Sequence, residues 1–246
     1  MKYLEKLNTL NFYLSNPKFI KWRKYEFNHN AYLNLNKSWL QKYKFDTVLD
    51  IGANLGQSAI ALSYAFPGSV IHSFEPIPEC FKILKEVSNQ LPNVTVNNFA
   101  LGEEKGEYSF RLNEYSASSS LLTIAEGHVR HFPHTSSTTE TKVNVVKLDD
   151  YVKEADTGSR ILIKMDVQGF EKQVILGGFS TFSSTSVVIL ETSFEILYDS
   201  QSLFNDIYEL MKEMGFVYVG SFDQLLSPTN GKILQQDAIF TNSLNR

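Results

Sequence analysis

The residues that can bind a small ligand lie in the segment V-L-D-I-G-A-N-L-G, from Val48 to Gly56. A short apolar run typical of a buried strand ends here in a glycine turn, and a helix follows. Gly52 and Gly56 permit a tight turn and close approach of a ligand, and Asp50 lies at the strand's carboxyl end, where open α/β sheets bind ligands. The spacing is G-x-x-x-G, which differs from the G-x-G-x-x-G of dinucleotide-binding turns. The segment predicts a ligand site and leaves a pyrophosphate or a carboxylate open as the bound group.

A carboxylate after the second strand narrows the ligand class. The apolar run from Val70 to Phe74 ends at Glu75, 23 residues beyond Gly52. A carboxylate at that place can accept hydrogen bonds from the two hydroxyls of an adenosine ribose. The turn and Glu75 together predict an adenosyl ligand. The alternatives are that Asp50 only caps a helix or loop and that Glu75 is an ordinary surface carboxylate.

Two further carboxylates are candidates for a general base, which must come within hydrogen-bond reach of the proton that it removes. Asp166 follows the expected strand Ile161 to Met165, and Glu191 ends the expected strand Val187 to Glu191. Since carboxyl ends of parallel strands share one edge of a sheet, we expect both at the reacting centre.

The histidines of H-V-R-H-F-P-H are a third group of candidates. His128, His131 and His134 recur every three residues, but Pro133 argues against one helix presenting all three. We predict His128 and His131 as candidate bases or orienting groups and no metal site, with ordinary loop histidines as the alternative. Cys80 is the only cysteine, which excludes a disulfide framework or a cysteine-based metal cluster.

The elements that must position these residues alternate between strands and helices. The apolar runs predict strands at Thr47–Ile51, Val70–Phe74, Val94–Phe99, Ile161–Met165, Val187–Glu191, Phe216–Gly220 and Asp237–Thr241. Helical periodicity predicts helices at Gln57–Phe66, Glu79–Gln90, from Gly169, and at about Ser202–Met214. The last two strands lack a helical crossover, so we expect an antiparallel hairpin. The result is an α/β, doubly wound, Rossmann-like sheet of seven strands with one antiparallel C-terminal strand.

Two segments interrupt or precede this pattern. Residues 106–150 contain two alternating runs around a serine-rich stretch, which predicts a β-hairpin insertion with a mobile loop. Residues 1–44 form an expected helical, basic and aromatic cap, in which Asn16-Pro17 ends the first helix. We divide the chain into this cap and a ligand-binding domain at 45–246.

The charge of the cap differs from that of the remaining chain. Residues 1–44 carry nine Lys and Arg against two Glu, whereas the remaining residues are acidic in balance. A solvated face is one interpretation; an anionic substrate, a membrane surface or a nucleic acid is another, although no dedicated nucleic-acid motif is present. The cap's aromatic residues can pack on the core, cover an acceptor or form a homodimer contact.

Seven short motifs occur in order along residues 45–241. They are V-L-D-I-G-A-N-L-G-Q-S (Val48 to Ser58), F-E-P-I-P (Phe74 to Pro78), N-F-A-L-G (Asn98 to Gly102), S-S-S-L (Ser118 to Leu121), L-D-D-Y (Leu148 to Tyr151), K-M-D-V-Q-G-F-E (Lys164 to Glu171) and D-A-I-F (Asp237 to Phe240). This ordered set resembles the FkbM-like family of S-adenosylmethionine-dependent methyltransferases. One departure is Gln168, where the family's pattern frequently has Glu, so we leave Gln168 out of catalysis.

The resemblance implies a class I methyltransferase fold, S-adenosyl-L-methionine as the cofactor, and O-methylation of a sugar or glycan-like hydroxyl. Matched motif by motif, the glycine turn holds the methionine and ribose end, Glu75 the ribose, and the N-F-A-L segment the adenine edge. The cofactor-binding residues that it implies are Asp50, Gly52, Asn54, Gly56, Ser58, Glu75, Pro76, Asn98, Ala100, Leu101 and Asp166.

Two other functions remain open at this point. An NAD-dependent oxidoreductase shares the ribose carboxylate, and a non-catalytic module can retain an adenosyl pocket without an acceptor site. The partner that we expect is a small-molecule or glycan acceptor. No run of roughly eighteen apolar residues and no signal-peptide pattern occurs, so we expect no transmembrane segment and a cytoplasmic location.

Overall fold

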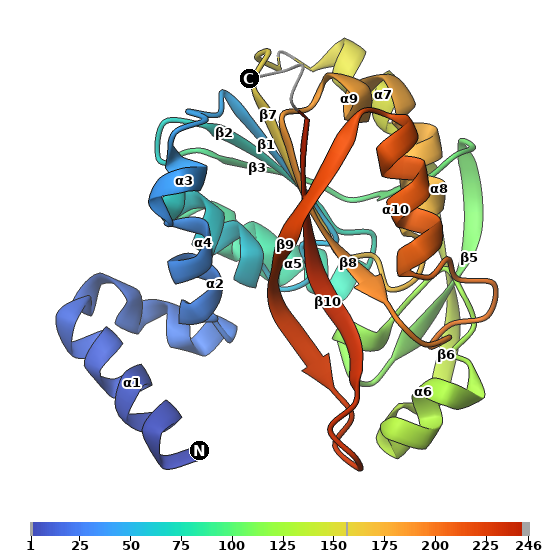
Figure 1. Cartoon of the computed structure of the whole chain (residues 1–246), viewed down its shortest axis with the longest axis horizontal. Coiled ribbons are helices and arrows are strands. Elements are labelled where there is room, and N and C mark those ends of the chain that lie inside the picture. Colours follow the sequence, from blue (N-terminus) through green and yellow to red (C-terminus); the bar gives the residue numbers. More distant parts are fainter. Residues whose placement is uncertain (1, 156, 243–246) are drawn as a thin grey trace.

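Seven strands form one sheet in the order β3-β2-β1-β7-β8-β10-β9 (Figure 1). The computed structural model describes residues 2–155 and 157–242, and of residues 2–5 the backbone alone. The strands of this sheet are β1 (Thr47–Ile51), β2 (Val70–Phe74), β3 (Val94–Asn97), β7 (Ile161–Met165), β8 (Val187–Ser193), β9 (Phe216–Leu226) and β10 (Ile233–Asn242). β10 runs antiparallel to β8 and β9, whereas β1 is parallel to β2 and β7. The predicted seven-stranded sheet with one reversed C-terminal strand is confirmed.

Helices cover both faces of the sheet, so its central strands are buried along nearly their whole length and are mostly apolar. Alternate residues of one strand point to opposite faces. Val48 of β1 packs on the side of α4 (Gln57–Ala65) and α5 (Pro78–Ser88), and Leu49 packs on the opposite side against a second group of helices. The bounds of the helices on that second side are α7 (Leu148–Glu154), α8 (Glu171–Gly177), α9 (Phe179–Ser184) and α10 (Phe204–Glu213).

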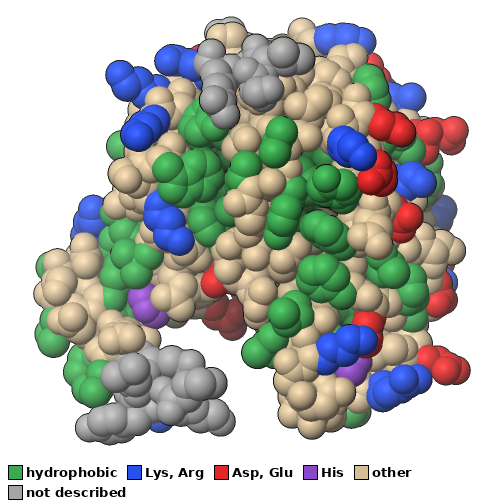
Figure 2. Space-filling model, viewed as in Figure 1, with side chains coloured by type: hydrophobic (Ala, Val, Ile, Leu, Met, Phe, Trp, Pro, Cys, Tyr) green, Lys and Arg blue, Asp and Glu red, His purple; other side chains and the backbone are tan. Residues whose placement is uncertain are grey.

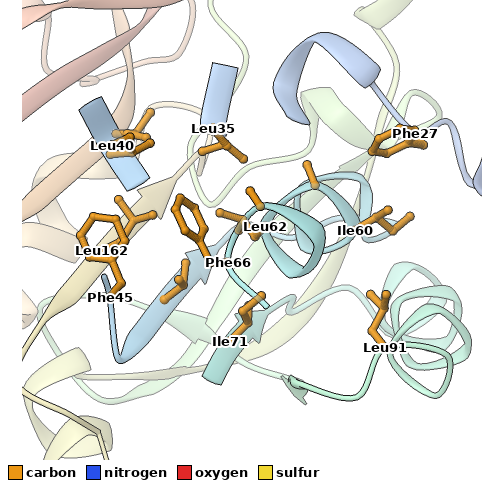
Figure 3. Close-up of a cluster of buried hydrophobic side chains, with 14 of the residues drawn as sticks. Phe27, Leu35, Leu40, Phe45, Ile60, Leu62, Phe66, Ile71, Leu91 and Leu162 are labelled. Carbon is orange, nitrogen blue, oxygen red and sulfur yellow. The ribbon is translucent and has the colours of Figure 1, made fainter. Parts of the chain in front are cut away.

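The N-terminal cap consists of helical segments, and its middle part packs on α4. They are α1 (Lys2–Ser15), η1 (Pro17–Tyr25), α2 (His29–Leu35) and α3 (Ser38–Gln41), so the first helix ends at Asn16-Pro17 as predicted. Phe19 and Trp22 are fully buried, and the Trp22 Nε1–H donates to the Tyr64 hydroxyl of α4 at 3.2 Å. Figure 3 shows Phe27, Leu35 and Leu40 of this segment facing residues of α4 and the sheet. The cap's aromatic residues therefore form part of the hydrophobic core.

The insertion contains the predicted hairpin, in which β5 (Gly106–Asn113) pairs antiparallel with β6 (Thr138–Val146). A two-residue strand, β4 (Ala100–Leu101), joins β6 in a separate three-stranded sheet. The third strand of the main sheet was expected to reach Phe99 but ends at Asn97, because the chain leaves for this second sheet. Between β5 and β6 lie η2 (Ser116–Ser118), α6 (Glu126–His131) and η3 (Pro133–Thr135).

Two expectations concern the chain as a whole. The division at residues 1–44 and 45–246 stays a prediction, and its ends, Met1 and residues 243–246, lie outside the described residues. Within the described ranges, no helix combines the length and the apolar character that a membrane crossing requires.

Candidate active site

A cavity lies at the carboxyl ends of β1, β2 and β7, the edge at which open α/β sheets bind ligands. Its walls are formed by the glycine turn after β1, the segment after β2, residues 99–101 after β3, Phe110 of β5, the loop between β5 and α6, and the turn after β7. Its apolar part is lined by Phe99, Ala100, Leu101, Phe110, Leu121 and Phe170. A flat aromatic ring system fits such a surface, whereas the polar walls described below suit hydroxyl and charged groups.

Seven of the eleven residues expected at the cofactor line this cavity. They are Gly52, Asn54, Glu75, Pro76, Ala100, Leu101 and Asp166. The remaining four, Asp50, Gly56, Ser58 and Asn98, are not among the lining residues. Their binding roles stay predictions, and the structure gives three of them a supporting position that is described next.

Asp50 lies below the glycine turn and is completely buried. The Ser73 hydroxyl of β2 donates to its Oδ2 at 3.0 Å. Burial raises the pKa of Asp50, while Lys164 and the hydroxyls of Ser58 and Ser73 act in the opposite direction. Asp50 therefore connects β1 to β2 beneath the cavity.

Neighbouring elements lie so close to the glycine turn that they leave no room for a side chain at its two glycines. Gly52 has φ +84°, and a Cβ on it would lie 1.8 Å from the backbone oxygen of Asp166. Gly56 has φ +96°, and a Cβ there would lie 3.1 Å from Val87 Cγ1 of α5. The sequence suggested ligand approach as the reason for these glycines; packing against β7 and α5 is the reason that the structure shows.

Glu75 presents a carboxylate to the cavity although only 4% of its surface is exposed. The backbone N–H of Asn54 donates to its Oε2 at 2.9 Å, and that of Ile77 donates to its Oε1 at 2.8 Å. Burial raises the pKa of Glu75 to about 7, while these two N–H groups lower it. Each oxygen retains a further lone pair, so the fixed carboxylate can accept hydrogen bonds from a diol.

Asn98 supports this wall from behind. Its side-chain amide donates to the backbone oxygens of Glu75 at 2.9 Å and Pro76 at 3.1 Å. The amide thereby holds the chain after β2 against the segment that leads into β4. Ala100 and Leu101, two and three residues later, do line the cavity.

The serine strap, residues 116–120, closes one side of the cavity. The Ser116 hydroxyl donates to Asn54 Oδ1 at 3.0 Å, and the Ser120 hydroxyl donates to the backbone oxygen of Gln168 at 2.7 Å. The Tyr198 hydroxyl donates to the backbone oxygen of Ser118 at 3.2 Å. The strap is thus tied both to the glycine turn and to the turn after β7, a role that the polar sequence of this loop did not reveal.

Carboxylates gather on three neighbouring strands, where Asp166 follows β7, Glu191 lies in β8 and Asp237 pairs with Glu191 from β10. Asp166 lines the cavity and lies 3.6 Å from Lys164 Nζ, whereas Glu191 lies behind it. Burial, followed by the charges of Asp166, Glu171 and Asp237, raises the pKa of Glu191 well above its usual range. Burial also raises the pKa of Asp237 to about 6. In Figure 2 a hollow separates the N-terminal cap from the lobe that carries α6, and acidic side chains lie at its inner end.

Gln168 connects the two candidate bases, Asp166 and Glu191. Its Nε2 donates to Asp166 Oδ1 at 2.7 Å and to Glu191 Oε2 at 3.0 Å. The structure therefore brings both carboxylates together, as expected. The residue that joins them is Gln168, to which the sequence analysis gave no catalytic role. The motif K-M-D-V-Q-G-F-E contains Gln168, but its two partners come from different strands, and sequence spacing does not show such contacts.

The two candidate histidines lie away from the cavity walls. The ring of His128 packs against that of Tyr198 at 5.3 Å, and burial lowers its pKa to about 4. His131 is hydrogen-bonded to Ser227 and to Glu195, each at 3.0 Å. Catalytic roles for His128 and His131 stay predictions. Among the described residues, no group of three or more His, Cys, Asp and Glu side chains is arranged to hold a metal ion.

Comparison with known proteins identifies the family. The sequence profile of the methyltransferase FkbM domain matches residues 50–218. The chain is 28% identical to the 2-O-methyltransferase NoeI of Sinorhizobium fredii over 177 residues, which are 69% of this chain and 72% of that protein. It is 25% identical to the hexuronic acid methyltransferase AglP of Haloferax volcanii over 59% of this chain and 55% of that one. A third relative, the 31-O-demethyl-FK506 methyltransferase FkbM of Streptomyces tacrolimicus, is 24% identical over 75% of this chain and 77% of that one.

Solved structures support the fold. The crystal structure of methyltransferase FkbM from Methylobacillus flagellatus aligns with a TM-score of 0.51 at 14% identity. The alignment covers 80% of this chain and 44% of that one, so the chain spans less than half of that protein. The sheet order, with its reversed β10, is that of the class I methyltransferase fold. The chain therefore belongs to the FkbM family of methyltransferases.

Proposed function

We propose that this chain uses S-adenosylmethionine to methylate a hydroxyl oxygen of a sugar or glycan-like acceptor. The observation that carries the donor assignment is the carboxylate of Glu75, which two backbone N–H groups hold at the cavity wall. The acceptor class is supported by the relatives, since one is named for a hexuronic acid and two for O-methylation.

The residues present fit such a donor. Glu75 can accept from both ribose hydroxyls, and the apolar part of the cavity, with Phe99 and Phe170, suits the adenine ring. No side chain caps the start of α4 at Gly56, and a helix N-terminus favours an anionic group beside the glycine turn. When bound, S-adenosylmethionine supplies an electrophilic methyl group on a positively charged sulfur, which the carboxylates near Asp166 favour electrostatically.

The protein's own contribution to transfer is position, exclusion of water and proton removal. The serine strap closes one side of the cavity, which limits the access of water to the reacting groups from that side. In this proposal Asp166, which lines the cavity, accepts the proton of the acceptor hydroxyl. Alignment of the acceptor oxygen with the methyl group can supply much of the rate enhancement.

Calorimetric titration with S-adenosylhomocysteine tests the donor site. We expect the wild type to bind and Glu75→Gln to bind roughly 10-fold to 100-fold more weakly, because an amide can accept only one of the two ribose hydrogen bonds without a clash of donors. Glu86→Gln, an exposed change on α5, serves as the matched control and should bind as the wild type does. Equal binding by Glu75→Gln, or binding of NAD in place of S-adenosylhomocysteine, would overturn the donor assignment.

Mass spectrometry of glycans and metabolites incubated with the protein and S-adenosylmethionine tests the acceptor class. We expect a methyl mass gain on sugar-bearing molecules, and a strong loss of this gain with Asp166→Asn. Tight cofactor binding without methyl transfer to any member of a broad acceptor panel would favour a non-catalytic binding module. A homodimer through the N-terminal cap and a cytoplasmic location stay predictions, and light scattering and cell fractionation would test them.

A further inference from the structure

The first helix of the N-terminal cap, α1, presents an apolar side to solvent. Leu7, Leu10 and Leu14 are 45%, 56% and 72% exposed. Their spacing of three and four residues places them on one side of the helix, because an α-helix has about 3.6 residues per turn. Phe12 lies on the opposite side, where its ring centre is 5.3 Å from that of Phe19 in η1. Contacts within the protein therefore account for Phe12 but not for the three leucines, which we call the leucine stripe.

The second helix of the cap, η1, carries an exposed row of cations. It is a 3-10 helix, in which side chains three positions apart lie above one another. One row is aromatic and buried: Phe19, Trp22 and Tyr25. The row next to it is basic and exposed: Lys18, Lys21 and Lys24. We call this second set the lysine row.

The aromatic rings of η1 hold the lysine row in place. The three ammonium nitrogens lie 5.2, 4.3 and 4.5 Å from the ring centres of the aromatic residues that follow them in the sequence. A cation over an aromatic face is attracted to the ring. Among the side chains of residues 6–155 and 157–242, no carboxylate forms an ion pair with any of the three lysines. The row is therefore available to an anionic partner.

Arg23 connects the two helices of the cap at their exposed sides. Its guanidinium lies 5.4 Å from the centre of the Tyr13 ring of α1. Around the axis of α1, Tyr13 lies between the buried Phe12 and the exposed Leu10. Ile20, one turn before Arg23 on the same side of η1, is 52% exposed. Figure 1 shows α1 at the outer end of the cap, away from the sheet. We call the leucine stripe, Ile20, Arg23 and the lysine row together the cap surface.

The composition of the cap surface selects the kind of partner that can cover it. Aliphatic side chains favour an apolar environment, and cations favour an anionic one. An anionic lipid bilayer offers both, because its charged headgroups lie directly above its acyl chains. A nucleic acid would pair with the cations and leave the leucines in water. A symmetric contact with a second copy of the chain would set the cations against their own counterparts.

We propose that the cap surface docks this protein on an anionic lipid bilayer. The leucine stripe and Ile20 enter the boundary between headgroups and acyl chains, and the lysine row and Arg23 contact lipid phosphates. The charge of the chain supports this orientation, since residues 1–44 carry nine Lys and Arg against two Glu and the remaining chain is acidic in balance. No residue of the cap surface lines the donor cavity, so the docking is independent of the proposed methyl transfer.

Co-sedimentation of the whole chain with lipid vesicles tests the proposal. Vesicles of equal parts phosphatidylglycerol and phosphatidylcholine should pellet the protein, and vesicles of phosphatidylcholine alone should pellet far less of it. Each cation near an anionic surface contributes roughly a 5-fold gain in binding, so loss of the lysine row should weaken binding roughly 100-fold. The variant is the triple exchange Lys18→Gln, Lys21→Gln and Lys24→Gln. Its control exchanges three exposed lysines outside the cap and should bind as the wild type does: Lys82→Gln, Lys85→Gln and Lys105→Gln.

A second triple variant tests the apolar part of the contact. Leu7→Gln, Leu10→Gln and Leu14→Gln together remove the leucine stripe and keep every charge. Binding to the anionic vesicles should again fall roughly 100-fold, because the apolar area that enters the bilayer is lost. The control exchanges exposed apolar residues of α8 and α9, Leu176→Gln and Phe179→Gln, and should leave binding unchanged.

Exchange of the lysine row for Arg keeps its charge and should preserve binding, and circular dichroism confirms that each variant is folded. Equal binding of the wild type to both kinds of vesicle, or binding to neither, would overturn the proposal. Unchanged binding by either folded Gln triple variant would also overturn it. A dimer in light scattering that the leucine variant dissociates, without binding of the wild type to vesicles, would assign the surface to a second copy. Binding of S-adenosylhomocysteine in the same samples tests the donor site separately and should not differ among the variants.

Discussion

Gly52 and Asp166 touch at the floor of the cavity, because a Cβ on Gly52 would lie 1.8 Å from the Asp166 backbone oxygen. The Asp166 backbone N–H donates to the neighbouring Ile51 oxygen at 2.9 Å, which holds the two strand ends together. The glycine turn would bind S-adenosylmethionine, and Asp166 would accept the proton of the acceptor hydroxyl. These two groups are therefore in direct contact. Movement of either strand end would change the distance between donor and base.

Replacement of Gly52 by Ala should disrupt this contact. The added methyl group would overlap the backbone of β7 and would also oppose φ +84°, so we expect a loss of more than about 3 kcal/mol of unfolding free energy. Urea denaturation measures this loss. Gly220→Ala is the matched control, since Gly220 has φ +131° with no atom within 4 Å of an added Cβ. Equal losses for Gly52→Ala and Gly220→Ala would leave only the strain of positive φ and would show that the contact is not tight.

The raised pKa of Glu75 predicts a pH-dependent stability of the ligand-free protein. Burial raises this pKa to about 7, so between about pH 4.5 and 7 the folded state binds a proton that the unfolded state has released. The free energy of unfolding should therefore fall as the pH rises through this window, by at most about 3 kcal/mol from this group.

Urea denaturation of the wild type and Glu75→Gln at pH 5 and pH 7.5 measures this contribution. Glu171, whose pKa burial also raises to about 7, contributes equally in both proteins and cancels in the comparison. We expect a smaller fall in Glu75→Gln than in the wild type and in Glu86→Gln. The same fall in all three proteins would show that Glu75 is ionised across the whole range.

The same carboxylate predicts the pH dependence of donor binding. An ionised Glu75 accepts both ribose hydrogen bonds, whereas a protonated one must use one oxygen as a donor. The affinity for S-adenosylhomocysteine in the wild type should therefore fall as the pH drops below about 7. Calorimetry from pH 5.5 to 8.5 measures this, and an affinity that is constant over that range would contradict the assignment of the ribose to Glu75.

The N-terminal cap should contribute strongly to stability through Trp22. This side chain is fully buried, and its Nε1–H is bonded to Tyr64, so Trp22→Ala should cost about 3 to 5 kcal/mol of unfolding free energy. Leu14→Ala, on the outward face of α1 with 72% of the side chain exposed, should change stability by less than about 0.5 kcal/mol. Thermal denaturation compares the two. Equal, small effects would show that the cap is not part of the folded core.

The strap contact between Ser116 and Asn54 should slow donor release. Ser116→Ala removes a hydrogen bond at a partly exposed position, so we expect little change in stability and a several-fold faster dissociation of S-adenosylhomocysteine. Stopped-flow displacement measures the rate. Ser88→Ala, which removes an exposed serine hydroxyl on α5, is the control and should leave the rate unchanged. A Ser116→Ala rate equal to that of the wild type would mean that the strap does not control release.

The main sheet follows from the sequence because each of its strands contains a separate, mainly apolar segment. The missing crossover before Asp237 predicts the reversed strand, since a parallel neighbour needs a long connection. The bend at Asn98 was not predictable, because Phe99 and Ala100 continue the apolar pattern and the second sheet depends on pairing with β6, over forty residues away. The sequence shows which residues are apolar, but it does not show which of the two sheets they join.

Some positions in the candidate site are also predictable from the sequence, and others are not. Glu75 and Asp166 follow apolar strands directly, so their place at the cavity is predictable from local sequence. Asp50, in contrast, points inward below the turn, which depends on packing against β2 and β7. The role of Gln168 depends on Glu191 and Tyr198, which lie 23 and 30 positions farther along the chain. Such contacts are visible only once the strands are assembled.

The most direct test of the donor site is a crystal structure of the protein with S-adenosylhomocysteine. We predict that the ligand occupies the cavity between β1, β2 and β7, with both ribose hydroxyls within hydrogen-bond distance of the Glu75 carboxylate and the sulfur facing Asp166. A cavity without ligand density at saturating concentration, or a ligand whose ribose lies away from Glu75, would contradict the account.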